Sequence, residues 1–315
     1  MRFSFALFFI FASFSATATQ WLKFDEKTFL IAPPTNARYL TSNQAILIGQ
    51  RCAAIIDAHG DFSALENFAS EVKKRIPQPI CHLFSTSSDE EQILGMMLLA
   101  TEFPDATWHA PSYVSEHFNE YQNALEEKLS RFKQSLQLSQ SRIDTQPNVE
   151  LQQRLDKAKA RIDKWQNAQF SRPIAPSHTQ IDVELGEHLI TINTFQGATH
   201  SDLSVLSHYN LGLFAGLTAN PIPYAQGADA SVWLYVLEQL QATKITWILP
   251  SQGKPFKKSA LQKPIRFLKS VIENESTEAP VDLLQLYNND EITQTRLRLM
   301  YELAKAKQAQ KMQKH

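Results

Sequence analysis

One short segment of the chain gathers side chains that could bind a metal ion or take part in acid–base chemistry. Between Thr86 and Gly95 lie two neighbouring serines, an aspartate, two glutamates and a glutamine. Catalytic zinc is held by imidazole, carboxylate or thiolate groups, with one position left open for water. Serine hydroxyls and glutamine amides are neutral and bind metals weakly. The segment therefore offers carboxylates without the imidazoles that a strong zinc site requires.

The same segment resembles the strand–loop–helix motif of the metallo-β-lactamase superfamily, which reads THxHxDHxxG. Thr86 and Gly95 match the threonine and the glycine of the motif without a gap. Three later segments resemble further motifs of the superfamily in the right order: residues 197–201 its GHT segment, residues 213–217 its LFxGD segment and residues 250–253 its PGHG loop. Four such matches in order make chance agreement improbable.

This resemblance implies a fold class. It runs from about residue 43 to residue 255, interrupted by a helical segment. The fold it implies is of the α+β class: a four-layer αββα sandwich, in which two mixed sheets face each other and helices cover both outer faces. The site would lie at one edge of the sandwich. Because a fold does not confer chemistry, the function has to be argued from that site.

The resemblance also indicates which positions would hold metal, and most of them carry other residue types here. In chain order these positions are Ser87, Asp89, Glu91, Gln92, His200, Leu217 and Gln252. Of the seven, His200 alone keeps the residue type of the superfamily. We therefore expect no cofactor and no tightly bound zinc, and we assign no catalytic residue. A weak single-metal site through Asp89 and His200, or an oxygen-ligated hard cation through Asp89 and Glu91, stays open.

A turn at residues 57–60 resembles the Asp-Thr-Gly turn at the rim of the metal cleft in the superfamily. By this resemblance, Asp57 would orient groups of the site without binding metal itself. His59, in the same turn, could serve as a substitute ligand or could simply be exposed to solvent.

The two cysteines each begin an apolar run of strand length, Cys52 before residues 53–57 and Cys81 before residues 82–86. In the resembled fold, these strands are parallel neighbours, so both thiols would lie at the same end of adjacent strands. A disulfide is feasible there if the Cα atoms lie within about 7 Å. Two buried free thiols are the alternative.

The first residues have the pattern of an export signal. Arg2 precedes a run of Phe, Leu, Ile and Ala that ends in the small residues 16–18, a cleavage pattern. We expect a cleaved signal peptide and a secreted, periplasmic protein that does not associate with a membrane after cleavage. The formal net charge of −1 gives no reason to expect nucleic-acid binding.

Composition divides the remainder of the chain. Residues 112–170 contain no glycine and are rich in Glu, Lys, Gln, Leu and Ala, and their apolar residues recur every three or four positions. Two antiparallel helices would pack along these stripes, either against the parent domain or as a lid or docking arm. We expect a signal peptide at 1–18, the first half of the sandwich at 19–111, a helical-hairpin insertion at 112–170, the second half at 171–260 and a C-terminal helical tail at 261–315.

Two functions from different classes fit these observations. The first is a non-catalytic pseudo-hydrolase with a degenerate zinc site that binds a small molecule or a protein partner. The alternative is a hydrolase that retains weak or single-metal activity through His200 and Asp89. A third possibility, Ser87 or Ser88 as a nucleophile with His200 as base, lacks the GxSxG elbow that such serines occupy.

Overall fold

The computed structural model describes residues 20–33, 41–224 and 229–312. The signal peptide predicted at residues 1–18 lies outside these described residues. Within them, no helix combines the length and the apolar character needed to cross a bilayer.

The first sheet changes from antiparallel to parallel pairing along its width. Its strands lie in the order β1 (Gln20–Lys23), β2 (Thr28–Ala32), β3 (Gln44–Ile48), β4 (Ala53–Ile56), β5 (Ile80–Phe84) and β6 (Thr107–His109). The pairs from β1 to β4 are antiparallel, whereas β4–β5 and β5–β6 are parallel. Parallel neighbours need a crossover connection. Helices α1 (Phe62–Arg75) and α2 (Glu90–Glu102) provide these two crossovers.

The second sheet contains the later strands. They lie in the order β12 (Phe256–Lys257), β11 (Trp247–Leu249), β10 (Gly212–Phe214), β9 (Asp202–Ser207), β8 (Leu189–Phe195) and β7 (Gln180–Glu184). Only β10 and β11 are parallel among these pairs. Between these two strands the chain forms the 3-10 helix η1 (Gly216–Ala219) and helix α6 (Ala230–Ala242).

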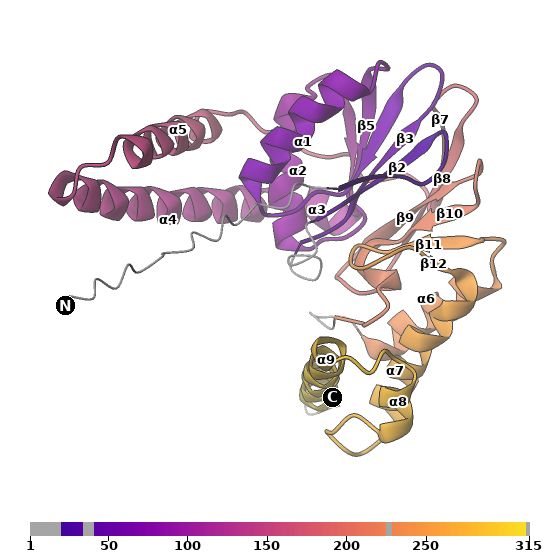
Figure 1. The fold of residues 1–315 in the computed structure, drawn as a ribbon. Helices are drawn as coiled ribbons and strands as arrows, with labels where there is room; N and C mark the ends of the chain where they lie inside the picture. The colour runs from indigo at the N-terminus through magenta and orange to yellow at the C-terminus, as the bar shows by residue number, and fades with distance from the viewer. Residues whose placement is uncertain (1–19, 34–40, 225–228, 313–315) are drawn as a thin grey trace, which may run out of the picture.

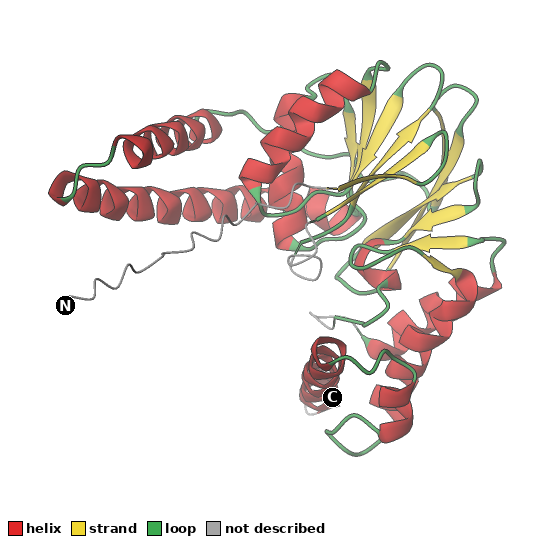
Figure 2. Cartoon of the chain, viewed as in Figure 1, coloured by secondary structure: helices red, strands yellow, loops and turns green. Residues whose placement is uncertain are grey.

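Three apolar clusters join the layers, and Figures 1 and 2 show how these layers are arranged. One lies between the two sheets and includes Leu47, Phe84, Ile192 and Val205. A second joins the first sheet to α1 and α2, and a third joins the second sheet to α6 and to the C-terminal helices. The order of layers is therefore helix, sheet, sheet, helix, which confirms the predicted α+β, αββα fold.

Between the two halves of the sandwich the chain forms a helical hairpin. It consists of α3 (Ser112–Glu116), α4 (Phe118–Thr145) and α5 (Val149–Gln166). Near the sheets the hairpin is packed: Tyr121, Leu125 and Leu129 are buried, and the Trp165 ring meets Phe62 edge-on at 5.0 Å. Its far end projects from the sandwich (Figure 1) and leaves Leu138 65% exposed. The hairpin is thus anchored at its base and solvated at its tip.

After β12, the chain continues through the 3-10 helix η2 (Lys258–Leu261) and helices α7 (Gln262–Glu273), α8 (Val281–Gln285) and α9 (Glu291–Met312). Helix α9 packs with α7 through a buried apolar stripe that includes Leu297, Tyr301 and Ala304. The Tyr301 hydroxyl donates a hydrogen bond of 3.0 Å to the Ser270 carbonyl in α7. This packing places the first turns of α9 beside the cavity that Asp89 and Gln252 line.

Candidate functional site

A buried carboxylate fixes the start of the loop that follows β5. Asp57, directly after β4, has a positive φ of 60°. Its side chain accepts hydrogen bonds from the backbone N–H of Thr86 at 2.8 Å and from the Thr86 hydroxyl at 2.7 Å. Burial raises the pKa of Asp57 to about 7, although both hydrogen bonds act in the opposite direction. Asp57 therefore holds the start of the site loop through Thr86 and does not itself line the cleft.

A neutral hydrogen-bond network, the Gln92 network, occupies the centre of the site. It comprises Ser42, Ser87, Gln92 and Ser251, all of them buried. The Ser87 hydroxyl donates to Gln92 Oε1 at 2.6 Å. The Gln92 Nε2 group donates to the hydroxyls of Ser42 at 2.7 Å and Ser251 at 2.8 Å. One amide therefore joins the loop before β3, the loop between β5 and α2, and the loop after β11.

The start of α2 holds Gln92 in this position. Asp89 caps the helix, and its side chain accepts the backbone N–H of Gln92 at 3.1 Å. Gly95 faces the turn at His59, where an added Cβ would lie 2.3 Å from the His59 carbonyl oxygen. Only glycine allows α2 to approach the turn this closely.

The loop before β9 presents a threonine, and not a histidine, to the interior. The buried carboxylate of Asp202 accepts the backbone N–H groups of Gly197 and Thr199 at 2.9 Å each, and the Thr199 hydroxyl at 2.7 Å. Burial raises the pKa of Asp202 to about 6. Thr199 in turn accepts the Ser88 hydroxyl at 2.8 Å. These bonds fix Thr199 inward and leave the next residue, His200, exposed.

His200 lies in a hollow of its own. Its ring stacks on Tyr113 with centroids 4.6 Å apart, and the two rings border a hollow of about 260 Å³ together with Ser88, Glu90 and Thr199. Asp89 borders a different cavity. The structure therefore does not bring Asp89 and His200 into one pocket, contrary to the prediction that they could share a metal ion. The physical reason is that the hydrogen bonds of Asp202 fix Thr199 inward. His200, the next residue along the chain, is therefore exposed and lies outside the cleft.

The larger cavity, called the cleft below, contains most of the other predicted positions. Its volume is about 520 Å³. The predicted residues that line it are His59, Asp89, Glu91, Gln92, Leu217 and Gln252. Ser87 lies beneath it, hydrogen-bonded to Gln92. Two lining residues that the sequence reasoning missed, Arg296 and Met300, come from α9.

Most of the predicted residues have protein partners. His59 is buried, and its Nδ1 atom accepts the backbone N–H of Asp61 at 3.1 Å. Burial lowers the pKa of His59, which keeps the ring neutral at pH 7. Glu91 forms an ion pair with Lys128 of α4. The Arg296 guanidinium donates to Gln252 Oε1. The expectation that His59 could be solvent-exposed is thus not met.

These donors do not fit the ligand set of a catalytic zinc ion. Such a site needs three or more imidazole, carboxylate or thiolate groups around one point. Among the residues that the structure describes, one group of three such donors converges: Cys52, Cys81 and His82, with donor atoms within 4.8 Å of one another. It lies apart from the cleft, at the start of β5.

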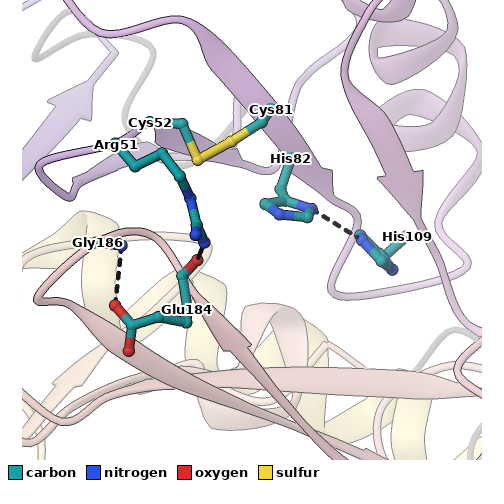
Figure 3. Close-up of a disulfide and its surroundings, with 7 residues drawn as sticks. All are labelled: Arg51, Cys52, Cys81, His82, His109, Glu184 and Gly186. Carbon is teal, nitrogen blue, oxygen red and sulfur yellow. Dashed lines mark hydrogen bonds between the residues drawn. A yellow bond between two sulfur atoms is a disulfide. The ribbon is translucent and has the colours of Figure 1, made fainter.

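That group contains a disulfide (Figure 3). Cys52 and Cys81 are bonded, with their Cα atoms 6.0 Å apart. Of the two possibilities left open by the sequence, the structure therefore has the bonded one. His82 adjoins the disulfide, and its Nδ1 atom lies 3.1 Å from Nε2 of His109 on the neighbouring strand. Since both sulfur atoms are used in the disulfide, this group offers one imidazole and no thiolate.

Known structures share the fold that these elements form. Over 80% of this chain and 99% of the other, it superposes on a metallo-β-lactamase from Pontibacter korlensis with a TM-score of 0.56 and 15% sequence identity. The metallo-β-lactamase FIM-1 from Pseudomonas aeruginosa, solved in its mono-zinc form, gives a TM-score of 0.56 at 11% identity over 80% of this chain and 96% of that one. A metallo-β-lactamase from Hirschia baltica gives 0.52 at 12% identity, over 80% and 98%.

The chain therefore has the metallo-β-lactamase fold, as the sequence motifs predicted. No family model of protein sequences matches the chain, and no curated protein matches it either.

Proposed function

We propose that this protein is a secreted pseudo-hydrolase: it has the metallo-β-lactamase fold and a degenerate metal site, and it binds a small molecule in the cleft without hydrolysing it. The observation that carries the proposal is the Gln92 network. Where the resembled motif has metal ligands, a neutral amide connects three loops through hydrogen bonds of 2.6 to 2.8 Å.

The network replaces the mechanical role of a metal but not its chemical role. Cross-linking loops requires only bonds between them, and each buried hydrogen bond contributes about 1 kcal/mol net. In a zinc hydrolase, the metal activates water as a Lewis acid that lowers the pKa of the bound water towards neutrality. Amide and hydroxyl groups have no such effect. A site built from Gln92, Ser87 and Leu217 therefore keeps its shape and loses its means of hydrolysis.

The cleft remains suited to binding. Its volume of about 520 Å³ lies within the range of small-molecule sites. Asp61, Asp89 and Glu91 supply carboxylates to its lining, and Leu217 and Met300 supply apolar surface. A small polar molecule with hydrogen-bond donors is the chemical class that such a surface accepts best. The proposed export to the periplasm rests on Arg2 and the apolar run that follows it.

The test is hydrolysis of a β-lactam and of a thioester by the mature protein, with excess zinc and with EDTA. We expect no turnover in either condition. Turnover that requires zinc would contradict the proposal. Hydrolysis assisted by His200 and Asp89 together, the alternative expected from the sequence, is not supported, because the two residues border different cavities. A zinc-independent activity that His200→Ala abolishes and Ser87→Ala spares would contradict this conclusion.

A further inference from the structure

A second cavity adjoins the cleft and has the opposite charge. It has a volume of about 510 Å³ and shares Gln252 and Arg296 with the cleft. Its lining contains three basic residues, Lys254, Lys263 and Arg296, and no Asp or Glu among the described residues. We call it the cationic pocket. The cleft, in contrast, is lined by Asp61, Asp89 and Glu91, so an anion would favour the cationic pocket.

A buried donor without a partner lies in the wall of this pocket. Asn220 is 1% exposed, and its Oδ1 atom accepts the backbone N–H of Gln252 at 3.0 Å. That bond fixes the orientation of the amide. The Nδ2 group has no acceptor among the described residues. Buried polar groups are almost always hydrogen-bonded. An acceptor on a ligand would supply the hydrogen-bond partner that the Asn220 Nδ2 group lacks.

The pocket also holds its cations beside apolar surface. Lys263, half-buried at the start of α7, places its Nζ atom 5.5 Å from the centre of the Tyr287 ring. Tyr287 is itself fixed, because its hydroxyl donates to the Pro221 carbonyl at 2.9 Å. Ile222 and Phe256 add further apolar surface. An aromatic or aliphatic group could pack there while an attached anion reaches the basic side chains.

We propose that the cationic pocket binds a small organic anion, in which a carboxylate or phosphate group adjoins an apolar or aromatic body. The anion meets Lys254 and Lys263 and accepts a hydrogen bond from Asn220, and the body packs against Tyr287 and Phe256. The residues proposed to contact the ligand, Lys254, Lys263, Asn220, Tyr287 and Phe256, do not line the cleft, so binding here does not require that the cleft be catalytic or bind metal.

The experiment is a set of NMR titrations of the mature protein in EDTA, with four probes. Benzoate and phenyl phosphate carry an anion and a ring, benzamide carries the ring alone, and inorganic phosphate carries the anion alone. We expect benzoate or phenyl phosphate to bind at least about tenfold more tightly than both controls, and the affinity to fall as salt is added. Benzamide binding as tightly as benzoate would overturn the role of charge. Inorganic phosphate binding as tightly as phenyl phosphate would overturn the role of the body.

Variants locate the binding. In the double variant Lys254→Gln and Lys263→Gln, we expect a loss of affinity of about tenfold. The matched control is Lys269→Gln, which removes a charge from the same helix as Lys263 but at a residue paired with Glu238. Unchanged affinity in the double variant, or an equal loss in the control, would overturn the assignment. Because the titrations contain EDTA, a zinc-dependent activity found in the cleft would refute the pseudo-hydrolase proposal and leave this one standing.

Discussion

Replacing Gln92 by leucine tests whether an amide network, and not a metal, joins the loops of the site. Leucine has a similar size and no hydrogen-bonding group. The substitution removes the three bonds to Ser42, Ser87 and Ser251 and leaves three buried hydroxyls without that partner. Gln92 is 2% exposed, so the leucine side chain would replace it in a buried position.

The expected loss of stability follows from the number of bonds. Each buried hydrogen bond contributes about 1 kcal/mol net, so three of them give a loss of about 3 kcal/mol in the free energy of unfolding. Urea unfolding followed by circular dichroism measures this loss as a lower midpoint at an unchanged slope. The control is Gln134→Leu, at an exposed position of α4, which should change the free energy by less than about 0.5 kcal/mol.

Two results would refute this reasoning. One is a loss below about 1 kcal/mol for Gln92→Leu, which would mean that the amide does not hold the loops together. The other is a large loss of stability in the unsubstituted protein when EDTA is added, since a ligand that binds only the folded state stabilises it. In that case a metal would be doing what the structure attributes to Gln92.

Three further predictions concern the frame around the site. Replacing Cys52 and Cys81 together by serine should lower the free energy of unfolding by about 3.5 kcal/mol, because the disulfide closes a loop with a sequence separation of 29; an unchanged urea midpoint under non-reducing conditions would contradict this. Burial raises the pKa of Asp57 from 3.8 to about 7. The folded state therefore favours the protonated carboxyl, and the stability that this protonation provides is complete below pH 3.8 and is lost as the pH rises through 7. Asp57→Asn stays neutral and should gain stability over the natural protein by up to about 4 kcal/mol between pH 4 and pH 8; a difference that does not vary with pH would count against the raised pKa. Trp165→Ala should cost about 3 to 5 kcal/mol in urea unfolding because the ring is packed at the base of the hairpin, whereas Leu138→Ala at its exposed tip should cost almost nothing; equal effects would mean that the base is not anchored.

The fold could be predicted from sequence because several independent patterns agree. The motif segments stand in the correct order, and each lies where a strand ends. The helical stripes of residues 112–170 predict which faces are apolar, and Tyr121, Leu125, Ile162 and Trp165 are buried in α4 and α5. Farther from the sheets the prediction is wrong, because Phe132 and Leu151 of the same stripes are exposed. Such periodic patterns depend on the local chain alone, so they can be found without coordinates.

The details of the site could not be predicted, because they depend on contacts between distant segments. A match of residue types favoured His200, yet the hydrogen bonds of Asp202 fix Thr199 inward. The aspartate three residues after Thr199 was the available signal, since a carboxylate at that spacing can bond the preceding backbone N–H groups. Similarly, the tail was expected to be helical, but its amphipathic pattern did not reveal that Arg296 would reach the cleft and bond Gln252.

The zinc content of the purified protein would show whether the site holds a metal ion. The untagged mature protein would be purified with excess zinc, dialysed against metal-free buffer and analysed for zinc per chain. We expect far less than stoichiometric zinc, and a thermal midpoint that EDTA does not change. Stoichiometric zinc that survives dialysis, together with a midpoint that falls when EDTA removes the zinc, would contradict the proposal that the metal site is degenerate.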